Sequence, residues 1–197
     1  MRSKRNLFLL SAFALASCSS NHEPGAVSAP VMKLDKPFAA AGTIEMQLEG
    51  GSYTVRASSD EHIRVSFAGN TGDAIADVEA TGAHATLAIR NTPSNNFQAI
   101  VEVPATSDLT VHLGGGNLSL GAIAGNKDID SKAGNVTIAI PNADDYSSVD
   151  AAVKVGDLKA GPFGESGSGL APHVKWSGPG KYSLRASLGA GNLELKH

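Results

Sequence analysis

A five-residue template that recurs four times constrains the fold of this chain more than any other feature of its sequence. Each copy reads glycine, asparagine or aspartate, an apolar residue, any residue, and an apolar or small residue. The copies begin at Gly116, Gly134, Gly156 and Gly191, at intervals of 18, 22 and 35 residues. An alternating apolar pattern precedes all of them except the copy at Gly134. Strand, glycine corner and strand at a period of about twenty residues is typical of a β-solenoid.

The template has a physical explanation if each copy marks a sharp bend between two flat faces. Glycine adopts the positive φ angles that such bends require. Asparagine and aspartate tolerate the left-handed region better than other side chains, and in successive rungs they can form amide ladders. The predicted corner residues are therefore Gly116, Asn117, Gly134, Asn135, Gly156, Asp157, Gly191 and Asn192.

The sequence before the first copy of the template also predicts β-strands, so that the whole folded part is expected to be all-β. Apolar residues alternate in "TIEMQL", "SYTVRA" and "HIRVSF", and turn residues separate these stretches. "EGGS", between Leu48 and Tyr53, has the composition of a hairpin turn. We therefore expect antiparallel hairpins over about 42–104, leading into a parallel β-helix-like solenoid that continues to the C-terminus. The alternative is a β-sandwich.

The N-terminus has the features of an export signal. Arg2, Lys4 and Arg5 precede an apolar run that is too short to span a membrane. "LASC" follows, and it resembles the lipobox of bacterial lipoproteins. We predict a signal peptide over 1–17, a flexible tether rich in Ser and Pro over 18–37, and one folded domain over 38–197.

The lipobox resemblance implies a covalent lipid anchor. Cys18 would receive a diacylglyceryl group, the signal would be cleaved before it, and the new N-terminus would be acylated. Cys18 is also the only cysteine of the chain, so it has no intramolecular disulfide partner. Two or more acyl chains anchor a protein firmly without a transmembrane helix. The residue after Cys18 is Ser19 rather than aspartate, which by the same resemblance favours the outer membrane.

Charge excludes one class of partner. Removal of residues 1–17 takes away three basic residues and no acidic ones, which changes the formal net charge from −3 to −6. Such a chain lacks the basic surface that nucleic acid binding requires. The predicted partners are the membrane, through the acyl chains on Cys18, and a glycan or protein of unspecified identity.

Few residues suggest catalysis or cofactor binding. The glycines of "GGGNLS" do not make a dinucleotide fingerprint, because Ser119 occupies the third glycine position and strands lie on both sides. Asp128 and Asp130 share one strand face and are the candidates for calcium binding or an acid pair, with a solvated face as the alternative. Trp176 and Tyr182 are candidates for a sugar-stacking platform, or for a cap on the solenoid end. We predict no cofactor, no resident metal and no catalytic residue.

The lipobox, the repeated template and the closing "KYSLRASLGAGNLELK" resemble bacterial envelope proteins with the adhesin-type, or auto-transporter head-like, β-solenoid domain. The similarity covers roughly 40–197 and implies no catalytic residue. The sequence therefore predicts a lipid-anchored, non-enzymatic envelope protein for adhesion, scaffolding or partner binding, facing the periplasm or the cell surface. The alternatives are a β-helix enzyme acting on polysaccharide and a periplasmic sensor or accessory component.

Overall fold

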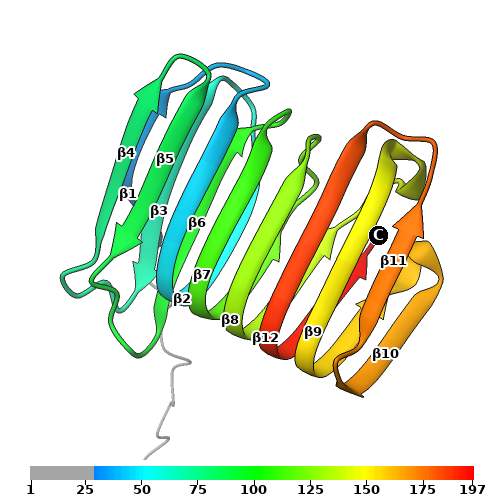
Figure 1. Cartoon of the computed structure of the whole chain (residues 1–197). Helices are drawn as coiled ribbons and strands as arrows, with labels where there is room; N and C mark the ends of the chain where they lie inside the picture. The colour runs from blue at the N-terminus through cyan, green and yellow to red at the C-terminus, as the bar shows by residue number, and fades with distance from the viewer. Residues whose placement is uncertain (1–28) are drawn as a thin grey trace, which may run out of the picture.

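The computed structural model describes residues 29–197, which form one mixed sheet of twelve strands (Figure 1). Two 3₁₀ turns, η1 (Ala143–Asp145) and η2 (Gly161–Phe163), accompany the strands. The prediction of an all-β chain is confirmed. No helix within 29–197 is long and apolar enough to cross a membrane. The strands are β1 (Val31–Pro37), β2 (Thr43–Ser58), β3 (His62–Gly69), β4 (Ile75–Thr81), β5 (His84–Arg90), β6 (Phe97–Pro104), β7 (Asp108–Leu120), β8 (Lys127–Ala139), β9 (Tyr146–Ala160), β10 (Glu165–Leu170), β11 (His173–Ser177) and β12 (Tyr182–Lys196).

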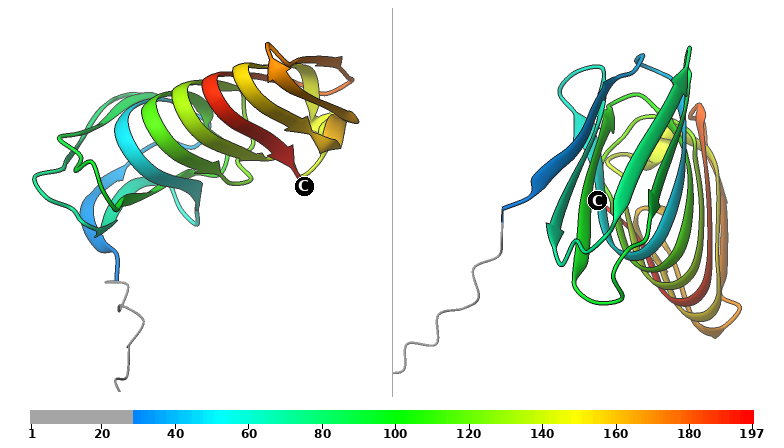
Figure 2. Two further views of the ribbon diagram at one scale, coloured as in Figure 1. Left: turned by 90° about the horizontal axis from the view of Figure 1, so that it is seen from below. Right: turned by 90° about the vertical axis from the view of Figure 1, so that its left-hand side faces the viewer.

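Five long strands stack in parallel and form the body of the molecule. Their spatial order is β2, β7, β8, β12 and β9, and we call them rungs. Each rung bends, so that its first half lies in one wall and its second half in another (Figure 2), and each contains one glycine with a positive φ angle at its corner. We call the halves before the glycines the first wall and the halves after them the second wall. The five corner glycines are neighbours in register: Gly51, Gly116, Gly134, Gly191 and Gly156.

The "EGGS" segment is a corner and not the hairpin turn that its composition predicts. β2 runs through it without reversing, and β2 stays parallel to β7 from Thr43 to Val55. Gly51 pairs with Gly116, and Ser52 takes the position that Asn117 has in the next rung. The hairpin prediction was wrong because a turn and a corner use the same residues. Only the direction of the neighbouring strand distinguishes them.

The order of the rungs also differs from the expected solenoid, in which successive coils stack in sequence order. The last rung of the chain, β12, does not follow β9 in the stack. It lies between β8 and β9 and pairs in parallel with both of them. The matching template in every rung explains how this is possible, because the corner of β12 fits between the corners of β8 and β9 as well as it would fit beyond them.

Antiparallel strands flank the stack at both ends. β1 pairs with β3, β3 with β6, and β4 with β5 at one end, while β10 and β11 pair with β9 at the other. The expected hairpins over 42–104 are therefore correct only in part, since β5 and β6 pair in parallel with β2. The strands belong to one continuous sheet and not to the two sheets of the alternative sandwich.

Side chains that point between the two walls make the core. The inward positions of β7 and β12 carry buried leucine, valine and alanine, whose similar sizes allow the rungs to stack evenly. Buried residues of the connecting segments, Ile123 and Ile140, contribute to the same core. Aromatic rings gather at the two ends, with centroids 4.9–6.2 Å apart in edge or tilted contacts: Tyr53, Phe67 and Phe97 at one end, and Tyr146, Phe163 and Trp176 at the other.

β8 is the exception to this apolar pattern. Its inward side chains before the corner are Lys127, Ile129 and Ser131, all 1–2% exposed. Lys127 occupies the position that leucine holds in both neighbouring rungs. Its Nζ donates to the carbonyl of Gly125 at 3.0 Å and to the hydroxyl of Tyr146 at 2.9 Å. Burial lowers the pKa of Lys127 to about 8, an effect that the carboxylates of Asp108 and Asp145 oppose.

The folded domain begins earlier than the sequence suggests. The tether was predicted to extend to residue 37, but Val31–Pro37 forms β1 and pairs with β3. The sequence placed "VMKLDKP" in the tether because it ends a stretch rich in Ser, Pro and small residues. In the structure this segment is an edge strand with mostly exposed side chains, which need little apolar alternation. The predicted signal peptide, Cys18 and the first part of the tether lie outside the described residues.

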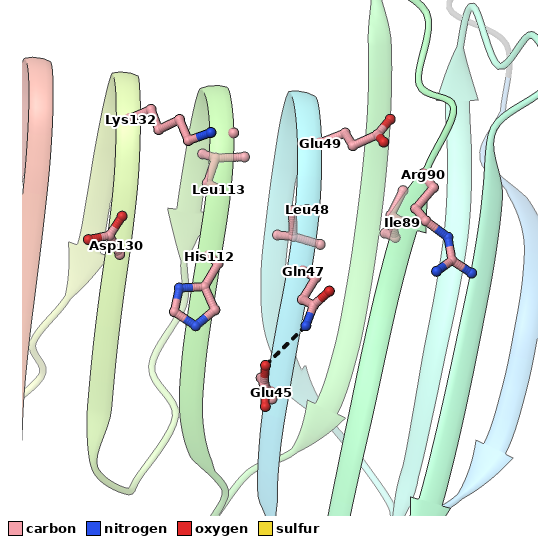
Figure 3. A pocket seen from close by; sticks show the side chains of 11 residues that line it. Glu45, Gln47, Leu48, Glu49, Ile89, Arg90, His112, Leu113, Asp130 and Lys132 are labelled. Atoms are coloured by element: carbon pink, nitrogen blue, oxygen red, sulfur yellow. Dashed lines mark hydrogen bonds between the residues drawn. The ribbon is translucent and has the colours of Figure 1, made fainter.

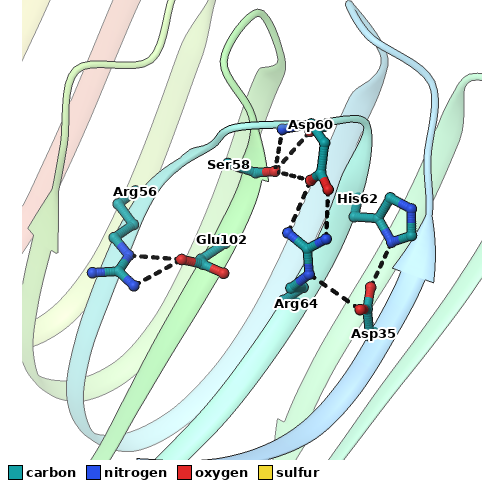
Figure 4. A network of polar contacts seen from close by, with 7 residues as sticks. All are labelled: Asp35, Arg56, Ser58, Asp60, His62, Arg64 and Glu102. Atoms are coloured by element: carbon teal, nitrogen blue, oxygen red, sulfur yellow. Dashed lines mark hydrogen bonds and ion pairs between the residues drawn. The ribbon is translucent and has the colours of Figure 1, made fainter.

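A network of ion pairs holds β1 to β3 (Figure 4). Arg64 contacts Asp35 at 3.1 Å and Asp60 at 2.6 Å, and Asp35 also contacts His62 at 2.5 Å. Hydrogen bonds from His62 and Arg64 hold the pKa of the Asp35 carboxyl below its ordinary value. Hydrogen bonds from Arg64 and Ser58 lower the pKa of Asp60 in the same way.

This network predicts acid sensitivity. The pKa of both carboxyls is lower in the folded chain than the ordinary 3.8. The two carboxylates therefore stabilise the folded state above pH 3.8, and this contribution is lost as the pH falls below that value. We expect Arg64→Met to lower the melting temperature at pH 7 and to flatten its fall between pH 5 and pH 2, as measured by circular dichroism. Arg56→Met is the control, since it removes only the exposed pair with Glu102. An unchanged acid profile in Arg64→Met would contradict the assignment.

Candidate functional site

Outward side chains form straight rows across the first wall. Because neighbouring rungs pair in register, Gln47, His112 and Asp130 lie side by side on β2, β7 and β8. One step along the strands, Glu45, Thr110 and Asp128 form the adjacent row. The fold therefore turns residues that are far apart in sequence into one continuous polar surface.

An open groove of about 600 Å³ crosses this wall beside the corner (Figure 3). Its base includes Gly114 of β7, where the outward side chain is missing between Glu49 on β2 and Lys132 on β8. A Cβ at Gly114 would make ordinary van der Waals contacts, at 3.6 Å or more, with the backbone of Leu48 and Glu49, so a side chain would fit here and its absence leaves room in the groove. The polar residues that line the groove are Glu45, Gln47, Glu49, Arg90, His112, Asp130 and Lys132.

Some of these polar groups are already engaged. The Gln47 amide donates to Glu45 at 3.1 Å, and Glu49 accepts from the backbone N–H of Thr92 at 3.2 Å. Arg90 pairs with Asp77 on β4 at 2.6 Å. Within residues 29–197, no side-chain hydrogen bond or ion pair engages His112, Asp130 or Lys132. These three side chains are exposed and are available to a ligand.

The chemistry of the groove suits a polar ligand. It offers a free carboxylate, a free ammonium and an imidazole over a narrow base, so it can both accept and donate hydrogen bonds. Phenylalanine, tyrosine and tryptophan are absent from the residues that line it, so recognition would rely mainly on hydrogen bonds and charge. Within 29–197, no group of three or more His, Cys, Asp or Glu side chains has the arrangement of a metal site.

Asp128 and Asp130 do lie on one outward strand face, opposite the buried Ile129. Their surroundings differ, however. Asp130 lines the groove, whereas Asp128 lies in a second hollow of about 510 Å³ farther from the corner. There Asp128 pairs with Arg185 of β12 at 3.3 Å. The two carboxylates therefore do not share one ligand position.

The predicted corner residues lie together along the bend. Gly116, Gly134, Gly156 and Gly191 have φ angles of 107–138°. The asparagines that follow form a ladder of side-chain amides, in which Asn192 donates to Asn135 at 2.8 Å and Asn135 donates to Asn117 at 2.9 Å. Asn117 in turn donates to Ser52 at 3.3 Å. Asp157 lies next to Asn192 in register. These residues build the frame that holds the rungs in register, and the groove residues depend on that register.

Trp176 and Tyr182 lie at the β9 end of the core and not at the groove. Both are half-buried, and the Trp176 ring packs against Phe163 at 4.9 Å. Tyr182 contacts Tyr146 edge-on at 6.4 Å. The rings cover the end of the apolar core, which corresponds to the cap alternative and not to an exposed stacking platform.

The groove residues Glu45, Glu49, Arg90, His112 and Lys132 were not identified from the sequence. Each occupies an outward strand position, which by itself indicates only a solvated face. A weak signal was present in Gly114 to Gly116, because a template with one corner glycine needs no others before it. The extra glycine at position 114 removes a side chain from the outer face and opens the groove.

Comparison with known proteins finds a solved structure with a similar fold, but it does not assign the chain to a family. No protein-family model matches the chain, and no curated protein matches it. A solved structure of a candidate cell adhesion protein from Clostridium sporogenes superimposes with a TM-score of 0.55 at 14% identity, covering 85% of this chain and 99% of that one. This likeness supports a shared fold.

Two further solved structures are more distant. A candidate adhesin from Bacteroides fragilis gives a TM-score of 0.29 at 10% identity, over 85% of this chain and 97% of that one. A candidate adhesin from Parabacteroides distasonis gives a TM-score of 0.27 at 11% identity, over 82% and 68% of the two chains. Scores at this level carry no argument about fold or function.

Proposed function

We propose that this protein is a lipid-anchored, non-enzymatic protein of the bacterial envelope that binds a glycan or protein ligand through the groove of its first wall. The groove is the observation that carries the proposal, since it combines free charged side chains with an open base. The lipobox ending in Cys18 supports the anchor. The fold shared with a candidate cell adhesion protein supports a role in adhesion or envelope organisation.

The anchor and the location are tested together on cells. We expect Cys18→Ala to release the protein from the membrane fraction, because the acyl chains would be its attachment. Continued membrane association of this variant would contradict the anchor. Antibody and protease access to the domain on intact cells would support an outward-facing adhesin. Access only after permeabilisation would favour a periplasmic scaffold or accessory component.

The groove is tested by a substitution that reverses the charge of Lys132, its free ammonium group. Lys132→Glu places a third carboxylate beside Glu49 and Asp130, and we expect it to reduce binding of the purified protein on a glycan array by about tenfold or more. Lys159→Glu is the matched control, because Lys159 is an exposed outward lysine of the second wall. Equal losses in both variants would indicate a general charge effect and would contradict the groove as the binding site.

A second candidate function is an enzyme acting on polysaccharide. The observation that favours it is the presence of Glu45, Glu49 and Asp130 in one groove, since glycosidases use paired carboxyl groups. Release of reducing ends from a polysaccharide panel, with and without calcium, would support this function, provided that Asp130→Asn abolishes it. No release from any member of the panel would remove this candidate.

A further inference from the structure

The C-terminal strand occupies the middle of the parallel stack. β12 is the last strand of the chain, yet it lies between β8 and β9 (Figure 1). Among the strands of residues 29–197, β8 pairs only with β7 and β12, and β9 pairs only with β12, β10 and β11. β12 is therefore the single link between the two halves of the sheet. Without it, a slot one strand wide would separate them in both walls.

The slot has strict requirements at the corner. A Cβ on Gly191 would lie 1.9 Å from the carbonyl oxygen of Gly134, so only glycine fits at this position. After the corner, Asn192 donates to Asn135 at 2.8 Å. The inward side chains of β12 are Leu184, Ala186, Leu188, Leu193 and Leu195, each 1–2% exposed. β12 meets each of these requirements of the slot along its whole length.

The connection into β12 is short and passes over the beginning of β9. Ser177 at the end of β11 and Ser183 in β12 both pair with Ser148, from opposite sides. The intervening backbone is fixed there, because Gly178 and Gly180 donate to the carbonyls of Ser147 and Tyr146, each at 3.1 Å. The connection must therefore span two strand spacings, roughly 9–10 Å, and also arch over β9.

We propose that β12 is an exchangeable strand, and that the slot between β8 and β9 of one copy accepts β12 of a second copy of this chain. Every contact that β12 makes within the chain would form equally well between chains, so only the path of residues 178–181 would differ. This inference does not depend on the ligand groove. It identifies a second copy of the chain as a partner, joined through the backbone of the sheet.

The first test shortens the connection. Deletion of Gly178–Gly180 in full-length Cys18→Ala protein leaves two residues between Ser177 and Ser183, whose greatest span of roughly 11 Å cannot arch over β9. We expect this variant to fold as dimers or larger assemblies, measured by light scattering and circular dichroism. The control is an insertion of four Gly and Ser residues after Gly178, which should stay monomeric. A folded monomer would overturn the proposal, and so would an unfolded chain, because exchange would have restored the fold.

The second test leaves the connection unaltered. Two populations of the Cys18→Ala protein with different tags are unfolded together and refolded at high concentration. We expect assemblies that carry both tags. When one population carries Gly191→Val, its β12 cannot enter any slot but its own slot stays intact, so the yield of mixed assemblies should fall at least twofold. Recovery of singly tagged monomers alone, or the same yield with Gly191→Val, would overturn the proposal.

Discussion

Replacement of Gly134 by alanine is expected to destabilise the domain by about 3–5 kcal/mol, which lies at the upper end of single-residue effects. Gly134 has a φ of 124°, a region that alanine adopts only with strain. Its Cβ would also lie 1.7 Å from the carbonyl oxygen of Gly116 in the neighbouring rung. That oxygen belongs to a stacked corner and cannot move without disturbing the register. Urea unfolding followed by circular dichroism measures the loss.

Gly115→Ala is the matched control for this prediction. Gly115 is also near a corner, but a Cβ there would meet nothing closer than 3.7 Å, so we expect a change below about 0.5 kcal/mol. Asn135→Ala should give an intermediate loss of about 1–2 kcal/mol, because it removes the two exposed amide hydrogen bonds that Asn135 makes with Asn117 and Asn192. Equal stabilities of Gly134→Ala and Gly115→Ala would show that the corner tolerates a side chain.

The second large effect is a gain, expected from Lys127→Leu. The cost of holding a charged ammonium in the core corresponds to the fall of its pKa from 10.5 to about 8, or about 3 kcal/mol. Leucine already occupies the register position of Lys127 in β7 and β12. Since the substitution leaves the Tyr146 hydroxyl without its lysine donor, we expect a net gain of about 1–3 kcal/mol at pH 7 in urea unfolding.

The pH dependence distinguishes this charge effect from simple packing. The pKa of Lys127 is lower in the folded chain than the ordinary 10.5, so the unfolded chain holds more protons between pH 8 and 10.5, and stability from this group rises with pH. The advantage of Lys127→Leu should therefore shrink between pH 7 and 9.5. The exposed Lys132→Leu should show no such trend. A Lys127→Leu variant that is less stable than the original at every pH would contradict the prediction.

Neither the ion pairs of Arg64 nor the burial of Lys127 could be predicted from the alternation of apolar and polar residues alone. "KDIDSKAG" was recognised as the one stretch before a corner with little apolar content. Alternation correctly placed Asp128 and Asp130 outward. It did not indicate that Lys127 would be accepted inside, because that depends on the hydroxyl of Tyr146 and the carbonyl of Gly125.

The candidate groove was even less accessible to sequence reasoning. Its polar residues come from β2, β5, β7 and β8, and each is an ordinary side chain at an outward position. Their grouping depends on register across rungs and on the missing side chain at Gly114. The corner residues, in contrast, could be listed in advance, since each carries its own local requirement for glycine followed by a short polar side chain.

The sequence by itself determined the strand type, the corner glycines and the amide positions, because period-two alternation and positive φ are local properties of the backbone. Only the tertiary structure decided that "EGGS" is a fifth corner, that β12 lies between β8 and β9, and which polar side chains meet in the groove. Every rung has nearly the same template, so each could pair with any other. The choice among these pairings depends on contacts between residues distant in sequence, and no local pattern encodes it.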